Sequence, residues 1–130
     1  MKKVGRRQGQ PPISEEMKGW AAALASETAD WPGTAQRSFF GFTALYRGNK
    51  IFALLPRSRN LDSANTIAFK VEAPAGAIRR RLESDPRIGS MHEAKGRWYN
   101  LVLSSNADLH DALDWLGQAY TAAGSRKKAT

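Results

Sequence analysis

Apolar residues follow helical spacing near both ends of the chain and strand-like alternation in its middle. Met17, Trp20 and Leu24 recur on one helical face, which predicts an amphipathic helix over residues 14–29. Ser14 at its start is a typical N-cap, because its side chain can accept a hydrogen bond from the first turn. The chain therefore opens on a helix with one buried face.

A second long helix is predicted near the C-terminus. Leu109, Leu116 and Tyr120 belong to one apolar stripe that runs through about residue 121. Ser105 or Asn106 is expected to cap its first turn. This helix would bury its stripe against the same core as the first.

The middle of the chain reads as strands. Residues 39–47 and 50–55 are rich in aromatic and aliphatic side chains, and Gly48 and Asn49 form a turn between them that predicts a hairpin. Residues 65–72 alternate apolar and polar positions, which predicts a half-buried third strand. The other predicted segments are a polar loop over 56–64, a helix over 74–84, a short strand within 89–93 and a strand over 97–103.

This order of elements predicts a two-layer α+β domain. We expect an antiparallel sheet of four to five strands, packed by the N- and C-terminal helices on one face. The domain should cover residues 13–123, between a disordered basic arm over 1–12 and a basic tail over 124–130.

Composition narrows the class of protein. With 130 residues, 42% hydrophobic residues and no cysteine, we expect one globular domain without disulfides or thiolate chemistry. The apolar runs are too short to cross a bilayer, and no apolar segment follows the basic start as a secretory signal requires. We therefore expect a soluble, cytoplasmic protein.

The positive charge is unevenly distributed. The net charge is +8, and most of it lies in the two tails. Within the body, residues 37–97 carry a net +7, whereas 11–36 and 98–125 each carry −3. A basic middle between acidic flanks favours a surface that faces phosphate groups, although a solvated basic face is the alternative.

Few residues suggest catalysis. His110 lies beside Asp111 on the last predicted helix, and His92 lies in a loop beside Glu93, where it is a general base only if a pocket and a nucleophile accompany it. No phosphate-binding glycine motif, nucleophile motif or metal-ligand spacing occurs. We therefore expect no enzyme activity, no metal and no cofactor.

Basic and aromatic residues gather in two places. Arg79 and Arg80 project from the predicted second helix as phosphate clamps, or as an ordinary solvated helix face. Trp98 follows Lys95 and Arg97, a combination that can stack on a base and neutralise a phosphate, or that anchors a loop. We also expect Lys70, Trp98 and Arg47 to point from the sheet face that the helices leave open.

Five segments occur in an order that is typical of one family: WPGTA at 31–35, FGFTALYRGNKIFALL at 40–55, IAFKVE at 67–72, RWYNLV at 97–102 and LGQAY at 116–120. This series resembles the MmcQ/YjbR-like proteins. Lys70 and Trp98 match a lysine and a tryptophan that recur in the family, whereas Arg97 stands where a histidine is common. The resemblance implies a fold related to the CyaY-like (frataxin-like) arrangement, also described as a double-wing domain, and members are often described as DNA-binding.

The sequence thus predicts a small domain that binds DNA mainly through non-specific phosphate contacts. The alternative is a module without catalysis that binds a protein or a small ligand on the open sheet face around Trp98. The residues predicted to contact nucleic acid are Lys70, Arg79, Arg80, Lys95, Arg97 and Trp98.

Overall fold

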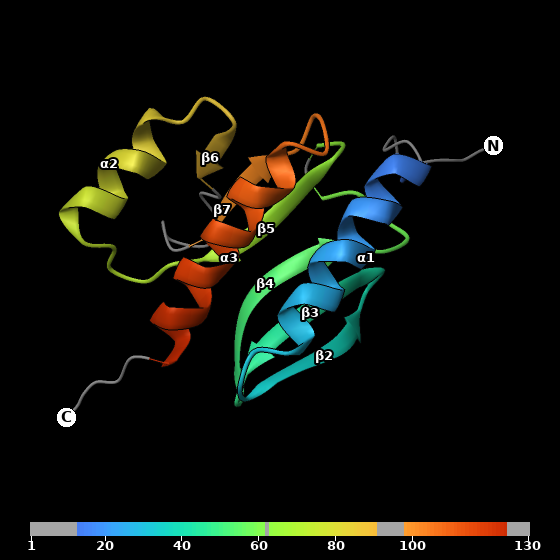
Figure 1. The fold of residues 1–130 in the computed structure, drawn as a ribbon, viewed down its shortest axis with the longest axis horizontal. Coiled ribbons are helices and arrows are strands. Elements are labelled where there is room, and N and C mark those ends of the chain that lie inside the picture. The colour runs from blue at the N-terminus through green and yellow to red at the C-terminus, as the bar shows by residue number, and fades with distance from the viewer. Residues whose placement is uncertain (1–12, 62, 91–97, 125–130) are drawn as a thin grey trace.

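A computed structural model describes residues 13–61, 63–90 and 98–124. It contains helices on one side of a single antiparallel sheet (Figure 1). The elements in chain order are α1 (Glu15–Ala29), β2 (Thr34–Phe39), β3 (Phe42–Arg47), β4 (Lys50–Pro56), β5 (Thr66–Lys70), α2 (Gly76–Ser84), β6 (Ile88–Ser90), β7 (Trp98–Val102) and α3 (Asp108–Gly124).

The sheet has six strands in the order β2-β3-β4-β5-β7-β6, and every neighbouring pair is antiparallel. Helices α1 and α3 lie side by side across one face of it, and α2 lies at the β6 edge (Figure 1). The predicted α+β fold of two layers is therefore confirmed. The predicted arm, and the tail beyond Gly124, lie outside the described residues, and α3 extends past the predicted end at about residue 121.

The strand that the sequence did not predict is β2. Its residues are polar and exposed almost throughout, so they lack the apolar alternation that marks a half-buried strand. It pairs with β3 through a hairpin whose turn is Phe40 and Gly41, so the predicted first strand over 39–47 is in fact the end of β2, a turn and β3. The Gly48 and Asn49 turn of the next hairpin is confirmed.

The alternation in the sequence predicted that β5 is buried on one face only. The structure instead buries it on both faces. Ile67 and Phe69 on one face and Ala68 on the other have no exposed surface. The cause is the position of β5 between β4 and β7, because larger side chains on neighbouring strands enclose a small alanine.

The core joins α3, β5 and β7 through stacked rings. The Trp115 indole of α3 lies parallel to the Phe69 ring of β5, with centroids 5.5 Å apart, and Phe69 also stacks on Tyr99 of β7 at 5.9 Å. The Arg81 guanidinium of α2 lies 4.5 Å from the Trp115 ring centroid. Trp20 of α1 is buried nearby in the same cluster, so both long helices pack on one continuous core.

The start of α1 is as predicted, and the start of α3 is not. The Ser14 hydroxyl accepts a hydrogen bond from the Met17 N–H at 3.0 Å. At α3, the Asn106 side chain instead accepts from the Trp20 indole N–H at 2.6 Å. The carboxylate that accepts from backbone N–H groups there belongs to Asp108, which binds the loop preceding α3.

We expected Arg47 to point from the open face of the sheet, and this prediction is wrong. The side chain points toward α3. Its guanidinium lies 4.1 Å from the Tyr120 ring centroid and donates to the Tyr120 carbonyl at 3.0 Å. Gly124 leaves room for it, since a Cβ there would collide with the Arg47 side chain. A cation near the last turn of α3 is favourable, because the carbonyl end of a helix carries partial negative charge. The described helices include none that is both long enough and apolar enough to span a membrane.

We predict that Arg47→Met lowers the free energy of unfolding by about 1–2 kcal/mol, because it removes a cation–π contact and a helix-end hydrogen bond. Arg47→Lys keeps the charge but not the planar guanidinium group, so its free energy of unfolding should lie between those of Arg47→Met and the wild type. Urea unfolding followed by tryptophan fluorescence measures this. Equal stability of Arg47→Met and the wild type would contradict the role given to this contact.

Candidate functional site

One face of the sheet carries none of the described helices. Phe69 stacks on Trp115 of α3, and the Gln36 amide donates to the Ala25 carbonyl of α1 at 2.7 Å, so the alternate positions on their strands point the other way. Because cross-strand partners share a face, the registers define this helix-free face. It presents Arg37 and Phe39 of β2, Phe42, Ala44 and Tyr46 of β3, Leu54 of β4, Ala68 and Lys70 of β5, and Trp98, Asn100 and Val102 of β7.

Aromatic side chains on the helix-free face are incompletely buried. Phe42, Tyr46 and Trp98 are half-buried, and Phe39 at the β2 edge is 40% exposed. Ala44 is fully buried among them. The face is therefore a row of rings with small residues between, which is a surface that suits flat ligands.

Arginine side chains lie over two of these rings. The Arg37 guanidinium is 5.3 Å from the Tyr46 ring centroid, and that of Arg59, from the loop after β4, is 5.6 Å from the Phe42 centroid. Both arginines are exposed. Planar guanidinium groups held against rings are oriented cations, and such groups bind phosphate oxygens well.

Charge is separated between the two layers of the fold. The described strands contain no Asp or Glu, and their charged residues are Arg37, Arg47, Lys50 and Lys70. Helices α1 and α3 together carry six acidic residues and one lysine, Lys18. The acidic flanks seen in the sequence thus form the helix layer, and the sheet layer is basic.

The structure brings together only part of the predicted site. Lys70 and Trp98 are cross-strand partners on the helix-free face. The Lys70 ammonium is paired with the Glu72 carboxylate at 3.1 Å, which reduces its charge toward a ligand. It also lines a small cavity with Lys50 and Glu72 near the last turn of α3.

Arg79 and Arg80 lie apart from that pair. Both are exposed on α2, at the opposite edge of the sheet from β2, and the neighbouring Arg81 contacts α3 on the helix side. Lys95 and Arg97 lie outside the described residues. The two arginines of α2 therefore form a second basic surface that is separate from the β2–β3 side of the sheet.

Sequence reasoning missed Arg37, Arg59 and Phe39, because none of them belongs to a basic cluster or an alternating strand. A signal was nevertheless present. Residues 34–61 contain five basic residues and no acidic residue, and nearly half of the chain's aromatic side chains fall in the same stretch. An acid-free run of this length within a chain that has 12 acidic residues marks the surface that the structure shows.

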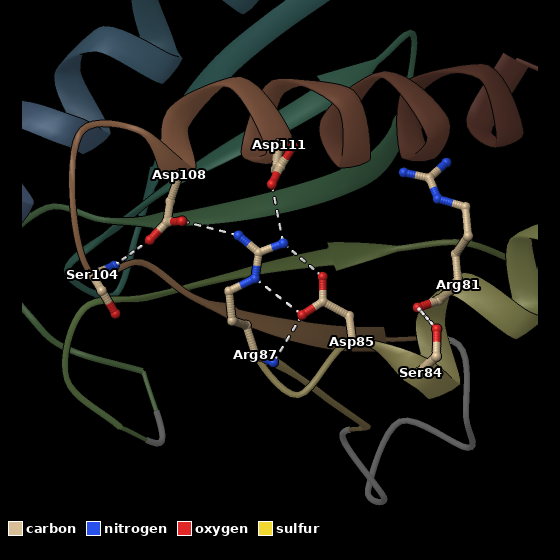
Figure 2. Close-up of polar contacts among 7 residues, drawn as sticks. All are labelled: Arg81, Ser84, Asp85, Arg87, Ser104, Asp108 and Asp111. Carbon is tan, nitrogen blue, oxygen red and sulfur yellow. Dashed lines mark hydrogen bonds and ion pairs between the residues drawn. The ribbon is translucent and has the colours of Figure 1, made fainter.

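Three carboxylates surround Arg87 (Figure 2). Its guanidinium donates to both carboxylate oxygens of Asp85, at 3.0 and 2.7 Å, to Asp108 at 3.0 Å and to Asp111 at 3.1 Å. It thereby ties the turn after α2 to the first turn of α3. This cluster is hard to predict from the sequence, because Asp108 and Asp111 lie more than 20 positions after Arg87.

The cluster changes the acidity of its carboxyl groups. Hydrogen bonds from the Arg87 side chain lower the pKa of Asp85 below its usual value of 3.8, against the effect of burial. The pKa of Asp108 is lowered chiefly by the Ser104 backbone N–H, with Ser105 and Arg87 adding to it. All three carboxylates are engaged with the Arg87 guanidinium, so we interpret the cluster as structural.

The described residues contain no group of three or more His, Asp or Glu side chains able to hold a metal ion. His110 is exposed on α3, and His92 lies outside the described residues. The helix-free face, with its partly exposed rings and exposed arginines, is therefore the candidate binding surface.

Comparisons with known proteins return no matching family model, curated protein or solved structure. The resemblance to the MmcQ/YjbR-like proteins therefore stays a prediction.

We predict that Arg87→Met lowers the free energy of unfolding by roughly 2 kcal/mol near neutral pH, since three half-buried carboxylates lose their common partner. Asp85 and Asp108 titrate lower in the folded than in the unfolded chain, so their contribution is complete above pH 3.8 and is lost as the pH falls through their folded pKa values. The difference in the free energy of unfolding between Arg87→Met and the wild type should therefore become smaller in acid.

Urea unfolding at neutral pH and at about pH 3 measures this difference. Arg80→Met, an exposed change on α2, is the matched control and should leave stability unchanged at both pH values. A gap between Arg87→Met and wild type that is equally large in acid would contradict the ion-pair account.

Proposed function

We propose that this chain is a nucleic-acid-binding domain that holds DNA against its helix-free face, mainly through non-specific phosphate contacts. The observation that supports this most is the charge separation between the layers. A sheet layer without acidic residues lies opposite a helix layer with six of them. A polyanion would be attracted to the sheet side and repelled from α1 and α3.

The chemistry of the face fits both parts of a nucleic acid. The Arg37 and Arg59 side chains are exposed, and a guanidinium group can bind phosphate oxygens through several donors at once. The rings of Tyr46 and Trp98 offer surfaces for stacking on bases or sugars. Rings and planar cations recognise features that all sequences share, so this proposal includes no base-specific reading.

Two of the predicted groups complete the proposed interface. Lys70 and Trp98 would extend it toward the end of β5 and the start of β7. Arg79 and Arg80 would add phosphate contacts only if the nucleic acid also passes the β6 edge. DNA binding is also what the resemblance to the MmcQ/YjbR-like proteins implies, and we keep that family membership as part of the proposal.

We predict that Arg37→Gln weakens DNA binding and makes the plot of log affinity against log salt concentration less steep by about one unit, as expected for one lost phosphate contact. Fluorescence-anisotropy titration of labelled DNA at several salt concentrations measures both quantities. Lys18→Gln on α1 removes the same charge from the helix layer and is the matched control. It should leave the slope unchanged.

A second comparison separates the two basic surfaces. The double variant Arg79→Gln, Arg80→Gln reports whether α2 takes part in DNA binding.

Equal effects of Arg37→Gln and Lys18→Gln on DNA binding would contradict a site confined to the helix-free face. If the DNA affinity of the wild type does not depend on salt and Trp98→Ala abolishes that binding, phosphate contacts are not its source. That result would support a small-ligand or protein module on the same face.

A further inference from the structure

The turn between β2 and β3 exposes two phenylalanines. Phe40 is 75% exposed and Phe39 is 40% exposed, and these are the two exposed large apolar side chains of the described chain. Their rings contact each other edge to face, with centroids 4.8 Å apart. We refer to Phe39 and Phe40 together as the hairpin tip.

Phe40 occupies a backbone conformation that does not suit it. Both central residues of this turn have positive φ, 50° at Phe40 and 88° at Gly41, as in a type I′ hairpin turn. Asparagine or glycine is preferred at the first position of such a turn, because a large side chain is strained at positive φ. Folding alone therefore favours asparagine over phenylalanine here, on grounds of both strain and exposure. Strain kept at an exposed aromatic residue points to a function.

The tip is held in place by a second loop. The Gly41 carbonyl accepts hydrogen bonds from the backbone N–H groups of Arg57 at 3.1 Å, Ser58 at 2.8 Å and Arg59 at 3.3 Å. The Arg59 guanidinium also donates to the Phe40 carbonyl at 3.2 Å. Because the backbone that follows the Phe40 side chain is held by these bonds, its ring is presented with less loss of entropy on binding.

The surroundings of the tip are basic. Arg57 and Arg59 flank the tip from the loop after β4, and Arg37 precedes it on β2. All three arginines are exposed. The tip is continuous with the helix-free face, since Phe39 and Phe42 are cross-strand partners. A rigid apolar projection surrounded by arginines is complementary to a ligand that has both flat apolar surfaces and negative charge.

We propose that the hairpin tip is a stacking site for an unpaired nucleobase, so that the domain prefers single-stranded to double-stranded nucleic acid. This inference rests on the proposed function and adds to it the class of nucleic acid. In a duplex the base faces are covered by their neighbours, and the arginines alone would find partners in the phosphates. In a single strand, the Phe40 ring could also stack on a base while Arg57 and Arg59 contact the adjoining phosphates.

A bilayer is the less fitting partner. Two phenylalanines at one turn form a small apolar surface, whereas binding to a membrane surface depends on a wider apolar face. The rings that adjoin the tip carry arginines across them, as in Arg59 over Phe42. Such a surface is suited to planar charged ligands.

The test compares full-length wild type with Phe40→Asn and Phe40→Trp. Labelled oligothymidylate and a mixed-sequence duplex of the same length serve as probes in anisotropy titrations. Phe40→Asn should weaken binding to the single strand between about 5-fold and 100-fold, the range expected for one lost stacking contact. It should leave duplex affinity unchanged, and its melting temperature should equal or exceed that of the wild type. Phe40→Trp should retain single-strand affinity.

Three results would overturn the inference in distinguishable ways. If Phe40→Asn binds both probes like the wild type, the tip is not a contact although the proposed function stands. If Phe40→Asn loses binding to phosphatidylserine vesicles but not to the single strand, the tip faces lipid. If the wild type binds neither nucleic acid probe, the proposed function fails together with the inference.

Discussion

The stacking of Trp115 on Phe69 fixes which face of the sheet is covered. Phe69 belongs to a central strand, and its ring lies between the indole of α3 and the Tyr99 ring of β7, while Arg81 of α2 lies against the same indole. Once these rings are buried, strand alternation assigns every other residue of the sheet to one face or the other. The helix-free face, with its rings and arginines, is a consequence of that assignment.

The same constraint gives the charge separation its geometry. Helices α1 and α3 turn their apolar stripes toward Phe69 and its neighbours, which leaves the acidic residues of α1 exposed. In α3, Asp108 and Asp111 pair with Arg87. The strands carry only basic charges. Of these, Arg37 and Lys70 belong to the helix-free face, whereas Arg47 points toward α3.

Local pattern was sufficient for the elements with strong periodicity. The stripe of Leu109, Leu116 and Tyr120 predicted α3, and Ser14 predicted the start of α1. The pattern failed where a distant part of the chain decides the outcome. Ala68 is buried because two other strands flank it, and Arg47 turns toward α3 because the end of that helix offers a ring and a carbonyl.

The candidate site was predictable only in part, for the same reason. The sequence placed Lys70 and Trp98 on the open face, and the register makes them partners. Arg59 gave no local sign, because its contacts are with a turn that precedes it by one hairpin. The Arg87 cluster likewise depends on acidic residues more than 20 positions away.

If nucleic acid binds the helix-free side of the sheet, titration with oligothymidylate should change the backbone amide chemical shifts there. We expect the largest shifts in β2, β3 and the loop after β4, with little change in α1. Shifts confined to α1 and α3, or to residues 1–12 and 125–130, would contradict binding there.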